Sequence, residues 1–544
     1  MNLFSFLVTL ILALFSTGVM SFISMATPIG PWIHPTIVLI SIMIFTMFYK
    51  NHNHNIALAV IGSSIGGILA TALGFSFPTL YFLDPELFNK LMQSPMEFSL
   101  TLFFLSLSAG LLGFLIAELF EHRFIVEQQL AFPIGQLVHT MISAQNQFKQ
   151  AMYLVIGFFT TVIFCALQDG FWKIKSFIPK VINILDPIKL GVIHIPAIQL
   201  EMFPIYWAIG YITGSLITLP LILGACSKIF IVDVINNLFF KNISSVSFIL
   251  AFCSGMVLCG AVLGMSDLPK LLKGLIKEFL KSKDSDKQNL LFQKNNPFDS
   301  LCSLRVTGGK LTVPMLLIIV LNFAFFTYFN FSPIVSVYVI LFTAVCAFQI
   351  TAIAGKIGLA QLGRFATFVM VPAMFLFKLS FMQLTIIATF VEVCGGVTAD
   401  LLFGKKLAHL SGIDNKRVKK YQLVGIVLSS ISVGIIFWVL INQFSLGSST
   451  LFVQRSQARA LLINAINFNY CVLFLGFIFG YILKKIKMNP MLVLGGLLMP
   501  FNISLGLILG SFFNFILTKK ENWEPFWSGV FASNSIWVLI KALI

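Results

Sequence analysis

Residues Gln422–Leu446 read QLVGIVLSSISVGIIFWVLINQFSL and contain no Asp, Glu, Lys or Arg. An α-helix rises 1.5 Å per residue, so about 20 apolar residues cross the roughly 30 Å hydrocarbon core of a bilayer. Leu311–Phe331 and Leu461–Leu483 also reach that length without an internal charge. Lipid offers the backbone no hydrogen bonds, and these runs lack the polar–apolar alternation of barrel strands. The sequence therefore predicts transmembrane helices.

The composition of the whole chain supports the same class. The 544 residues are 58% hydrophobic and only 10% charged, whereas soluble domains have about 45–50% apolar and about 25% charged residues. Such an excess of apolar side chains requires lipid as the main solvent. We expect an all-α integral membrane protein, a polytopic bundle of about 12–16 transmembrane helices.

The apolar runs set the expected order of these helices. They lie at 3–25, 32–49, 56–82, 97–120, 148–168, 203–225, 245–266, 311–330, 332–354, 365–377, 380–400, 422–446, 461–483, 488–518 and 525–543. The stretch 131–145 and the two pieces flanking Pro500 are candidate half-helices or hairpins, because Pro interrupts helical backbone.

Charge and cysteine usage narrow the class further. In a soluble domain the net charge of +16 would indicate nucleic-acid binding, but membrane proteins collect Lys and Arg in their cytoplasmic loops. The basic segments 267–310 and 404–422 are therefore expected to be cytoplasmic. The eight cysteines are scattered without metal-binding spacing, so we expect no metal site and no cofactor. Lys exceeds Arg, and Phe, Ile and Asn are abundant, which suggests an AT-rich bacterial genome. We therefore expect a bacterial inner-membrane protein.

One long polar segment divides the chain. We expect an N-terminal transmembrane half at 1–266, a basic cytoplasmic loop at 267–310 and a C-terminal transmembrane half at 311–544. Many transporters consist of two related halves, and the near-equal lengths agree with that organisation. An unrelated cytoplasmic linker is the alternative.

The segment Arg123–Gln136 reads RFIVEQQLAFPIGQ and carries the most informative motif. Pro133 and Gly135 interrupt regular helical backbone at the start of an apolar stretch. A half-helix that begins there would direct unpaired N–H groups at an anionic substrate group. An ordinary helix start with Pro in the first turn is the alternative.

This motif resembles the signature of the oligopeptide transporter (OPT) superfamily, which includes the yellow-stripe-like metal-chelate transporters. Three further segments resemble blocks of that family in the same order. These are Ala354–Gly358, the pair Asp400–Gly404 and Gln422–Gly425, and the block from Asn489 through Pro500 to Gly510. The resemblance covers roughly residues 97–544.

The resemblance implies a proton-coupled importer of small peptides or peptide-like compounds, with interrupted helices around a central site. The partners would be a small-molecule substrate, protons and the lipid bilayer. The residues expected to line the substrate site are Pro133, Gly135, Gln136, His139, Gly355, Gly358, Pro500 and Asn502.

Ionisable side chains inside a membrane are rare and usually functional, which makes them candidates for the proton site. We expect Glu392, Asp400 and Glu118 to serve in proton coupling. Glu392 and Asp400 are eight residues apart, so a continuous helix presents both on one broad side. For Asp400, a plain acid at the membrane interface is the alternative.

Two other functions stay open. One is uptake of a metal–chelate complex on the same scaffold, and the other is a membrane-embedded transferase or a subunit without transport activity. Gly62–Gly66 matches Gly-x-Ser-x-Gly, but a nucleophile elbow needs a preceding strand. The chain has no His-Glu-x2-His, P-loop or Gly-x-Gly-x2-Gly motif. We therefore expect a transporter rather than an enzyme.

Overall fold

A computed structural model gives the fold of the chain. It describes residues 3–27, 30, 32–48, 53–143, 147–169, 176–190, 193–195, 197–213, 215–245, 247–256, 258–259, 313–357, 360–448, 450–464, 469–486, 488, 490–498, 501–516 and 520–543. Within these residues, eight helices are long and apolar enough to cross a membrane, and five shorter apolar helices accompany them. The prediction of an all-α polytopic membrane protein is confirmed. The expected loop 267–310 lies outside the described residues.

The helices follow the predicted apolar runs closely. Their bounds are α1 (Leu3–Ala26), α2 (His34–Phe48), α3 (Asn53–Ser76), α4 (Thr79–Leu83), α5 (Pro85–Gln93), α6 (Pro95–Glu121), the π-helix η1 (His122–Glu127), α7 (Pro133–Ser143), α8 (Gln147–Asp169), α9 (Pro204–Thr213), α10 (Ser215–Ser227), the π-helix η2 (Lys228–Val232), α11 (Asp233–Phe239), a helix at Ser247–Met256, α13 (Val313–Tyr328), α14 (Pro333–Ile357), α15 (Leu362–Leu376), α16 (Phe381–Leu410), α17 (Asn415–Gln443), α18 (Gln454–Ile463), α19 (Tyr470–Lys485), α20 (Pro490–Leu498), α21 (Phe501–Ile516) and α22 (Lys520–Leu543).

Four long helices form the centre of the molecule. α3 and α6 each pack against both α16 and α17. Every residue of α3 from Ile56 to Ser76 is buried, as is every residue of α16 from Leu384 to Ala408. Helices buried on all sides belong to the core of a large bundle. Close approach depends on glycine, because a Cβ at Gly425 of α17 would lie 2.1 Å from the Gly62 carbonyl oxygen of α3.

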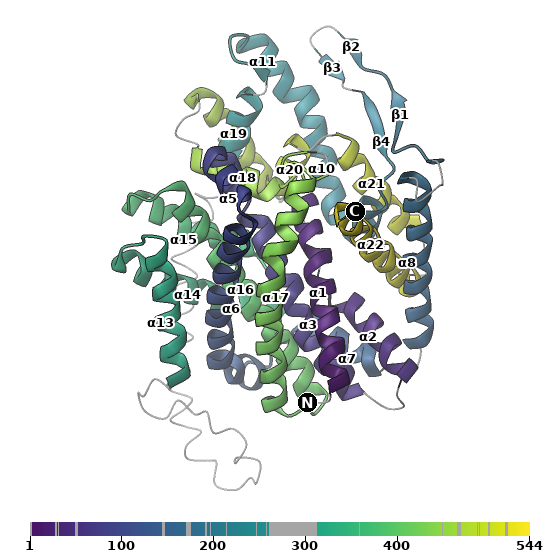
Figure 1. The fold of residues 1–544 in the computed structure, drawn as a ribbon. Coiled ribbons are helices and arrows are strands. Elements are labelled where there is room, and N and C mark those ends of the chain that lie inside the picture. Colours follow the sequence, from purple (N-terminus) through teal and green to yellow (C-terminus); the bar gives the residue numbers. More distant parts are fainter. Residues whose placement is uncertain are drawn as a thin grey trace.

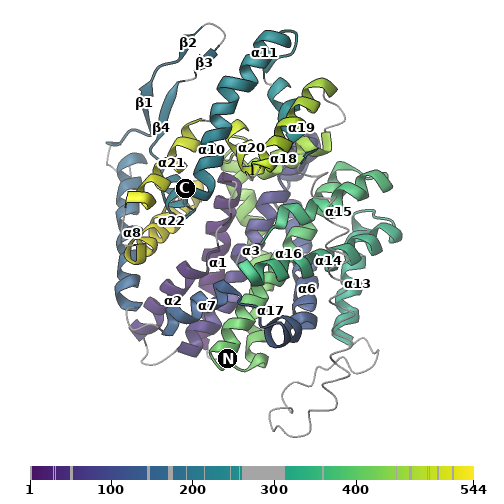
Figure 2. The same cartoon turned by 180° about the vertical axis from the view of Figure 1, so that it is seen from behind.

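The helices around this centre pack in matching ways. α1 contacts α3 and α17, and α14 correspondingly contacts α16 and α6. α2 packs on α3 as α15 packs on α16. Figures 1 and 2 show α13, α14 and α15 along one side of the central helices, with α8, α21 and α22 along the other.

The outer helices pack in pairs whose members are far apart in the sequence. α8 packs on α22, α9 on α21 and α10 on α20. The helix at Ser247–Met256 packs on α19, where a Cβ at Gly255 would lie 2.0 Å from the Leu473 carbonyl oxygen. Small residues at such crossings let membrane helices pack backbone to backbone. Residues before position 267 therefore pair with residues after 311 throughout this layer.

Two short helices, α7 and α18, lie at opposite ends of the molecule (Figure 1). Each follows a residue with positive φ, Phe132 (46°) before α7 and Val453 (47°) before α18. The Phe132 N–H donates to the Gly355 carbonyl at 2.8 Å, and the Val453 N–H donates to the Met25 carbonyl at 2.7 Å. Both short helices are thus attached by their first turn to the C-terminal part of a long helix, α14 or α1. The stretch 131–145, expected as a half-helix or hairpin, contains the short helix α7.

Two expected boundaries were wrong. The run 461–483 is not one helix, because α18 ends at Ile463 and Asn469 caps a new helix by accepting a 3.0 Å hydrogen bond from the Cys471 N–H. The expected loop 404–422 is mostly helical, since α16 continues to Leu410 and α17 begins at Asn415.

Four short strands follow α8, where none was predicted. β1 (Val181–Leu185) pairs antiparallel with β4 (Ile198–Glu201), and β2 (Ile188–Leu190) pairs antiparallel with β3 (Ile193–Ile195). Both views show β2 and β3 at the end of the molecule where α11 lies (Figures 1 and 2). Runs of three to five residues are too short to stand out by their hydrophobic pattern.

Candidate functional site

α16 carries charged side chains through the interior of the bundle. Glu392 is fully buried, Asp400 is 1% exposed and Lys405 is 2% exposed. At 1.5 Å per residue, Glu392 lies about 12 Å from Asp400 along the helix axis. Buried charges in a membrane protein need partners and usually mark a function. The partners of these three residues come from different helices.

The partner of Glu392 is Arg459 of α18. Their side chains form a buried ion pair, and Arg459 also donates to the Phe75 carbonyl at 3.1 Å and the Ser76 hydroxyl at 2.6 Å. The other carboxylate oxygen of Glu392, Oε2, has no hydrogen-bond partner within the described residues. This pair fastens α18 to α16 and to the end of α3.

A second arginine lies one helical turn before Arg459. The Arg455 guanidinium lies 4.0 Å from the centre of the Phe75 ring, which is the geometry of a cation–π contact. Its charge interacts with those of Glu392 and Arg459. A Cβ placed on Gly363 would be 3.6 Å from Glu392 Oε1, 3.8 Å from an Arg455 nitrogen and 3.9 Å from an Arg459 nitrogen. The three charged groups therefore converge on one point beside α15.

A cavity of about 130 Å³ lies next to this cluster. It is bordered by the segment before α2, by α3, by the start of α15 and by α18. Its lining includes His34, Ser64, Thr71, Phe75, Leu362 and Arg455. The cavity is thus partly polar and is enclosed by residues from both sides of segment 267–310.

Asp400 lies next to the same cavity through two of its lining residues. The Ser64 hydroxyl donates a 2.9 Å hydrogen bond to Asp400 Oδ2, and His34 Nε2 lies 3.2 Å from Asp400 Oδ1. The His34 contact has ion-pair distance without the alignment of a hydrogen bond. The side chain of Asp400 is buried between α2, α3 and α16, which does not fit the alternative of a plain acid at the membrane interface.

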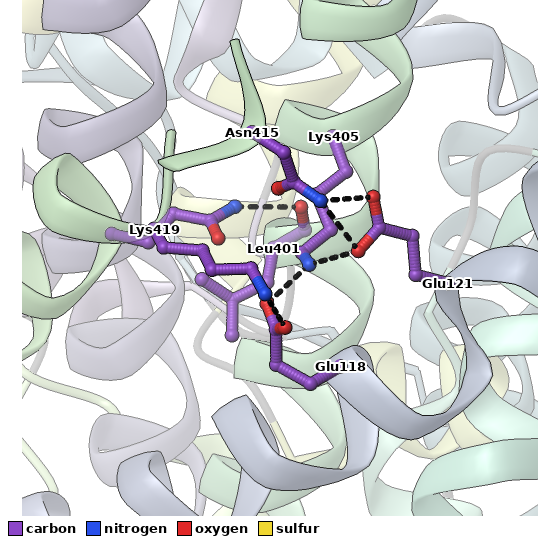
Figure 3. Close-up of polar contacts among 7 residues, drawn as sticks. Glu118, Glu121, Leu401, Lys405, Asn415 and Lys419 are labelled. Carbon is purple, nitrogen blue, oxygen red and sulfur yellow. Dashed lines mark hydrogen bonds and ion pairs between the residues drawn. The ribbon is translucent and has the colours of Figure 1, made fainter. Parts of the chain in front are cut away.

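Glu118 belongs to a separate ion network at one end of the molecule (Figure 3). Lys405 of α16 forms ion pairs with Glu118 and Glu121 of α6. Lys419 of α17 lies 2.5 Å from Glu118, and the Asn415 amide donates to Glu121 at 3.1 Å. The network joins α6, α16 and α17, and Glu118 is not among the residues that line the described cavity.

The predicted substrate residues around Pro133 lie at helix contacts. Pro133 is the first residue of α7, and a Cβ on Gly135 would be 2.7 Å from the Phe403 carbonyl oxygen of α16. Gln136 is exposed, and His139 Nδ1 lies 3.1 Å from the Ser411 hydroxyl. None of the four lines the described cavity.

The second group of predicted residues is described only in part. Gly355 accepts the hydrogen bond from Phe132, so the structure brings the α7 motif and the Ala354–Gly358 motif together. Gly358 and Pro500 lie outside the described residues, and Asn502 is described only as backbone within α21.

Sequence reasoning missed three residues of this site, His34, Arg455 and Arg459. The two arginines are four residues apart, and that spacing places them on one face of a helix. This signal was available, but the predicted helix began at 461 and left both arginines outside it. His34 carried no signal, because its partner Asp400 is far away in the sequence.

The fold and the buried polar centre define a class: a polytopic α-helical membrane protein with ion-paired side chains around an internal cavity. Residues 270–534 match the family model described as OPT oligopeptide transporter protein. The chain belongs to this superfamily, which confirms the resemblance seen in the sequence motifs, and is accordingly a membrane transporter of a peptide or a related substrate. A comparison with curated proteins found no match.

Proposed function

We propose that the chain is a secondary active importer of short peptides or peptide-like compounds and that the described cavity is part of its substrate site. The observation that carries the proposal is a partly polar cavity, lined in part by Arg455, His34 and Ser64, inside a largely apolar bundle. A bilayer protein keeps polar groups in its interior where they serve a substrate or an ion. Substrate sites of many transporters lie at such a position between the two halves.

The small volume of the cavity supports a substrate site that changes shape during transport. Its volume of about 130 Å³ is below the roughly 300–1,000 Å³ of pockets for drug-sized ligands. A peptide therefore requires the surrounding helices to separate. Movement of one half against the other would provide this space and would open the site to alternate sides.

We propose that residues 1–266 and 311–544 are two related halves with opposite orientation in the membrane. The matching packing of α1 and α14 on the central helices supports this. The equivalent attachment of α7 and α18, each through an N–H that follows a positive φ, supports it further. Inverted repeats place equivalent elements at opposite membrane faces, as α7 and α18 lie in Figure 1.

We propose that import is coupled to protons and that Asp400 is the best placed of the three predicted acids. Proton binding to Glu392 would leave the charge of Arg459 buried without its counter-ion, which is strongly unfavourable. Glu118 has two lysine partners and lies away from the cavity. Asp400 faces a hydroxyl and a histidine, both of which line the cavity.

The other predicted substrate residues have a supporting role in this proposal. Pro133 and Gly135 begin a short helix whose first turn is bonded to Gly355. This junction is suited to transmit movement between α7 and α14. Gln136, His139, Gly358, Pro500 and Asn502 remain candidates that rest on the family resemblance.

We propose a bacterial inner-membrane location with the segments 267–310 and 404–422 in the cytoplasm. The abundance of Lys and Arg in both segments supports this orientation. The turn between α16 and α17 lies at the same end as the first described residues (Figure 1). The start of α1 would then lie on the cytoplasmic side.

Uptake of an anionic metal chelate is a second candidate, because the cavity wall carries the cation Arg455. Uptake into proteoliposomes tests both candidates. Labelled di- to tetrapeptides and an iron–citrate complex are offered with and without an inward proton gradient. Gradient-driven accumulation of peptides is the expected result. Accumulation of the iron complex alone would replace the peptide proposal, and accumulation of neither would contradict import.

A further inference from the structure

We propose that Arg455 forms a carboxylate-binding subsite in the cavity, so that the transported compound carries a free carboxylate. This inference rests on the proposed import function and specifies its substrate class. It starts from three features of Arg455: its position on the cavity wall, the charge balance around it and the contacts that hold it.

Arg455 is half-buried and borders the cavity, whereas the residues of the neighbouring ion pair are more deeply buried. Glu392 is fully buried and Arg459 is 6% exposed. Neither of these two is among the residues that line the described cavity. A ligand in the cavity therefore meets the guanidinium of Arg455.

The charges around Arg455 favour an anion. The Arg455 guanidinium lies near one like charge, Arg459, and one carboxylate, Glu392. A second carboxylate, Asp400, contacts the lining residues Ser64 and His34. The described lining of the cavity contains no Asp or Glu. Arg455 therefore brings a permanent positive charge to the described lining, and the low dielectric of the interior makes its attraction for an added negative charge strong.

The chemistry of the site matches a carboxylate in particular. A guanidinium presents a planar fork of donors that fits the two oxygens of a carboxylate. The Phe75 ring at 4.0 Å limits the movement of this fork. The Thr71 and Ser64 hydroxyls are further polar groups of the same cavity. Peptides with a free C-terminus and polycarboxylate chelates both carry the required group.

The test compares three labelled compounds in proteoliposomes: a tripeptide with a free C-terminus, the same tripeptide as its C-terminal amide, and an iron–citrate complex. We expect the peptide acid to accumulate and the amide to be excluded. Selective uptake of the iron complex instead would keep the carboxylate subsite and assign it to chelates.

Variants of Arg455 link the selectivity to this residue. In Arg455→Gln, the half-saturation concentration for the peptide acid should rise about ten- to hundredfold, which is the usual effect of losing a hydrogen-bonded charge. Arg455→Lys keeps the charge and should recover part of the affinity. Arg364→Gln, at an exposed arginine of α15, is the matched control and should behave as wild type.

The outcomes separate the two proposals. Equal uptake of acid and amide, or unchanged affinity for the acid in a folded Arg455→Gln protein, would overturn the carboxylate subsite while import stands. Folding is checked by a single symmetric peak in size-exclusion chromatography, and Arg455→Lys decides the question if Arg455→Gln fails that check. A folded Arg455→Lys protein without measurable affinity for the peptide acid would also overturn the carboxylate subsite. Absence of uptake of all three compounds would overturn the import function and this inference with it.

Discussion

Glu392 of α16 and Arg459 of α18 form an ion pair in the interior of the bundle, although 67 positions separate them in the sequence. The pair lies beside the described cavity and connects α16 to the end of α3 through the Arg459 contacts with Phe75 and Ser76. The ion pair therefore stabilises the packing of α18 and also lies next to the proposed substrate site. Experiments on variants separate its effect on stability from any effect on transport.

Glu392→Gln should lower the free energy of unfolding by about 3–5 kcal/mol, because it leaves the Arg459 charge buried without its partner. Thermal unfolding of the purified protein in detergent measures this effect. The double variant Glu392→Gln with Arg459→Met removes both charges and should be more stable than Glu392→Gln alone. A single variant as stable as the wild type would contradict the role assigned to the pair.

Asp400→Asn should abolish proton-driven accumulation of substrate while sparing exchange of substrate across the membrane. The amide keeps the size of the side chain and the contact with Ser64 but does not take up a proton. Uptake with an imposed proton gradient and counterflow without one are the two measurements. Glu86→Gln, at an exposed acid of α5, serves as control. Normal gradient-driven accumulation in Asp400→Asn would exclude Asp400 as the proton site.

Lys405→Met should destabilise the end of the molecule at which α6, α16 and α17 meet. The Lys405 side chain is 1% exposed and bridges Glu118 and Glu121, so its loss brings two carboxylates together without a central cation. We expect a loss of about 1–3 kcal/mol in unfolding free energy. Lys420→Met removes an exposed lysine of α17 and should change stability little. Equal effects of the two substitutions would show that the network in Figure 3 is not stabilising.

The proposed orientation predicts which surface positions face the cytoplasm. In a variant without the eight native cysteines, Lys416→Cys at the start of α17 should react with an impermeant thiol reagent only from the cytoplasmic side. Glu86→Cys in α5, at the other end of the molecule (Figure 1), should react only from the outside. Labelling of intact cells and of inverted vesicles distinguishes the two sides. Reaction of both positions from one side would contradict the arrangement.

The sequence by itself determined the class of protein and most of the helices. Composition and the length of apolar runs are properties of the linear chain, and lipid permits few backbone structures. The short helix α7 was also predictable, because Pro133 and Gly135 act on their own local backbone. The family motifs also lie in short local segments, and the match over residues 270–534 covers the three that follow Arg123–Gln136.

Only the tertiary structure decided which polar groups meet. His34 contacts Asp400, and Arg459 pairs with Glu392, because helices that are distant in the sequence pack together. The end of α18 at Ile463 was equally hidden, because the run 461–483 carries no charge and the Asn469 cap decides where α19 begins. The hydrophobic pattern of a segment indicates how deeply that segment is buried. The partner of a buried charge depends instead on its neighbours in three dimensions. The cavity and the position of Arg455 on its wall therefore follow only from the tertiary structure.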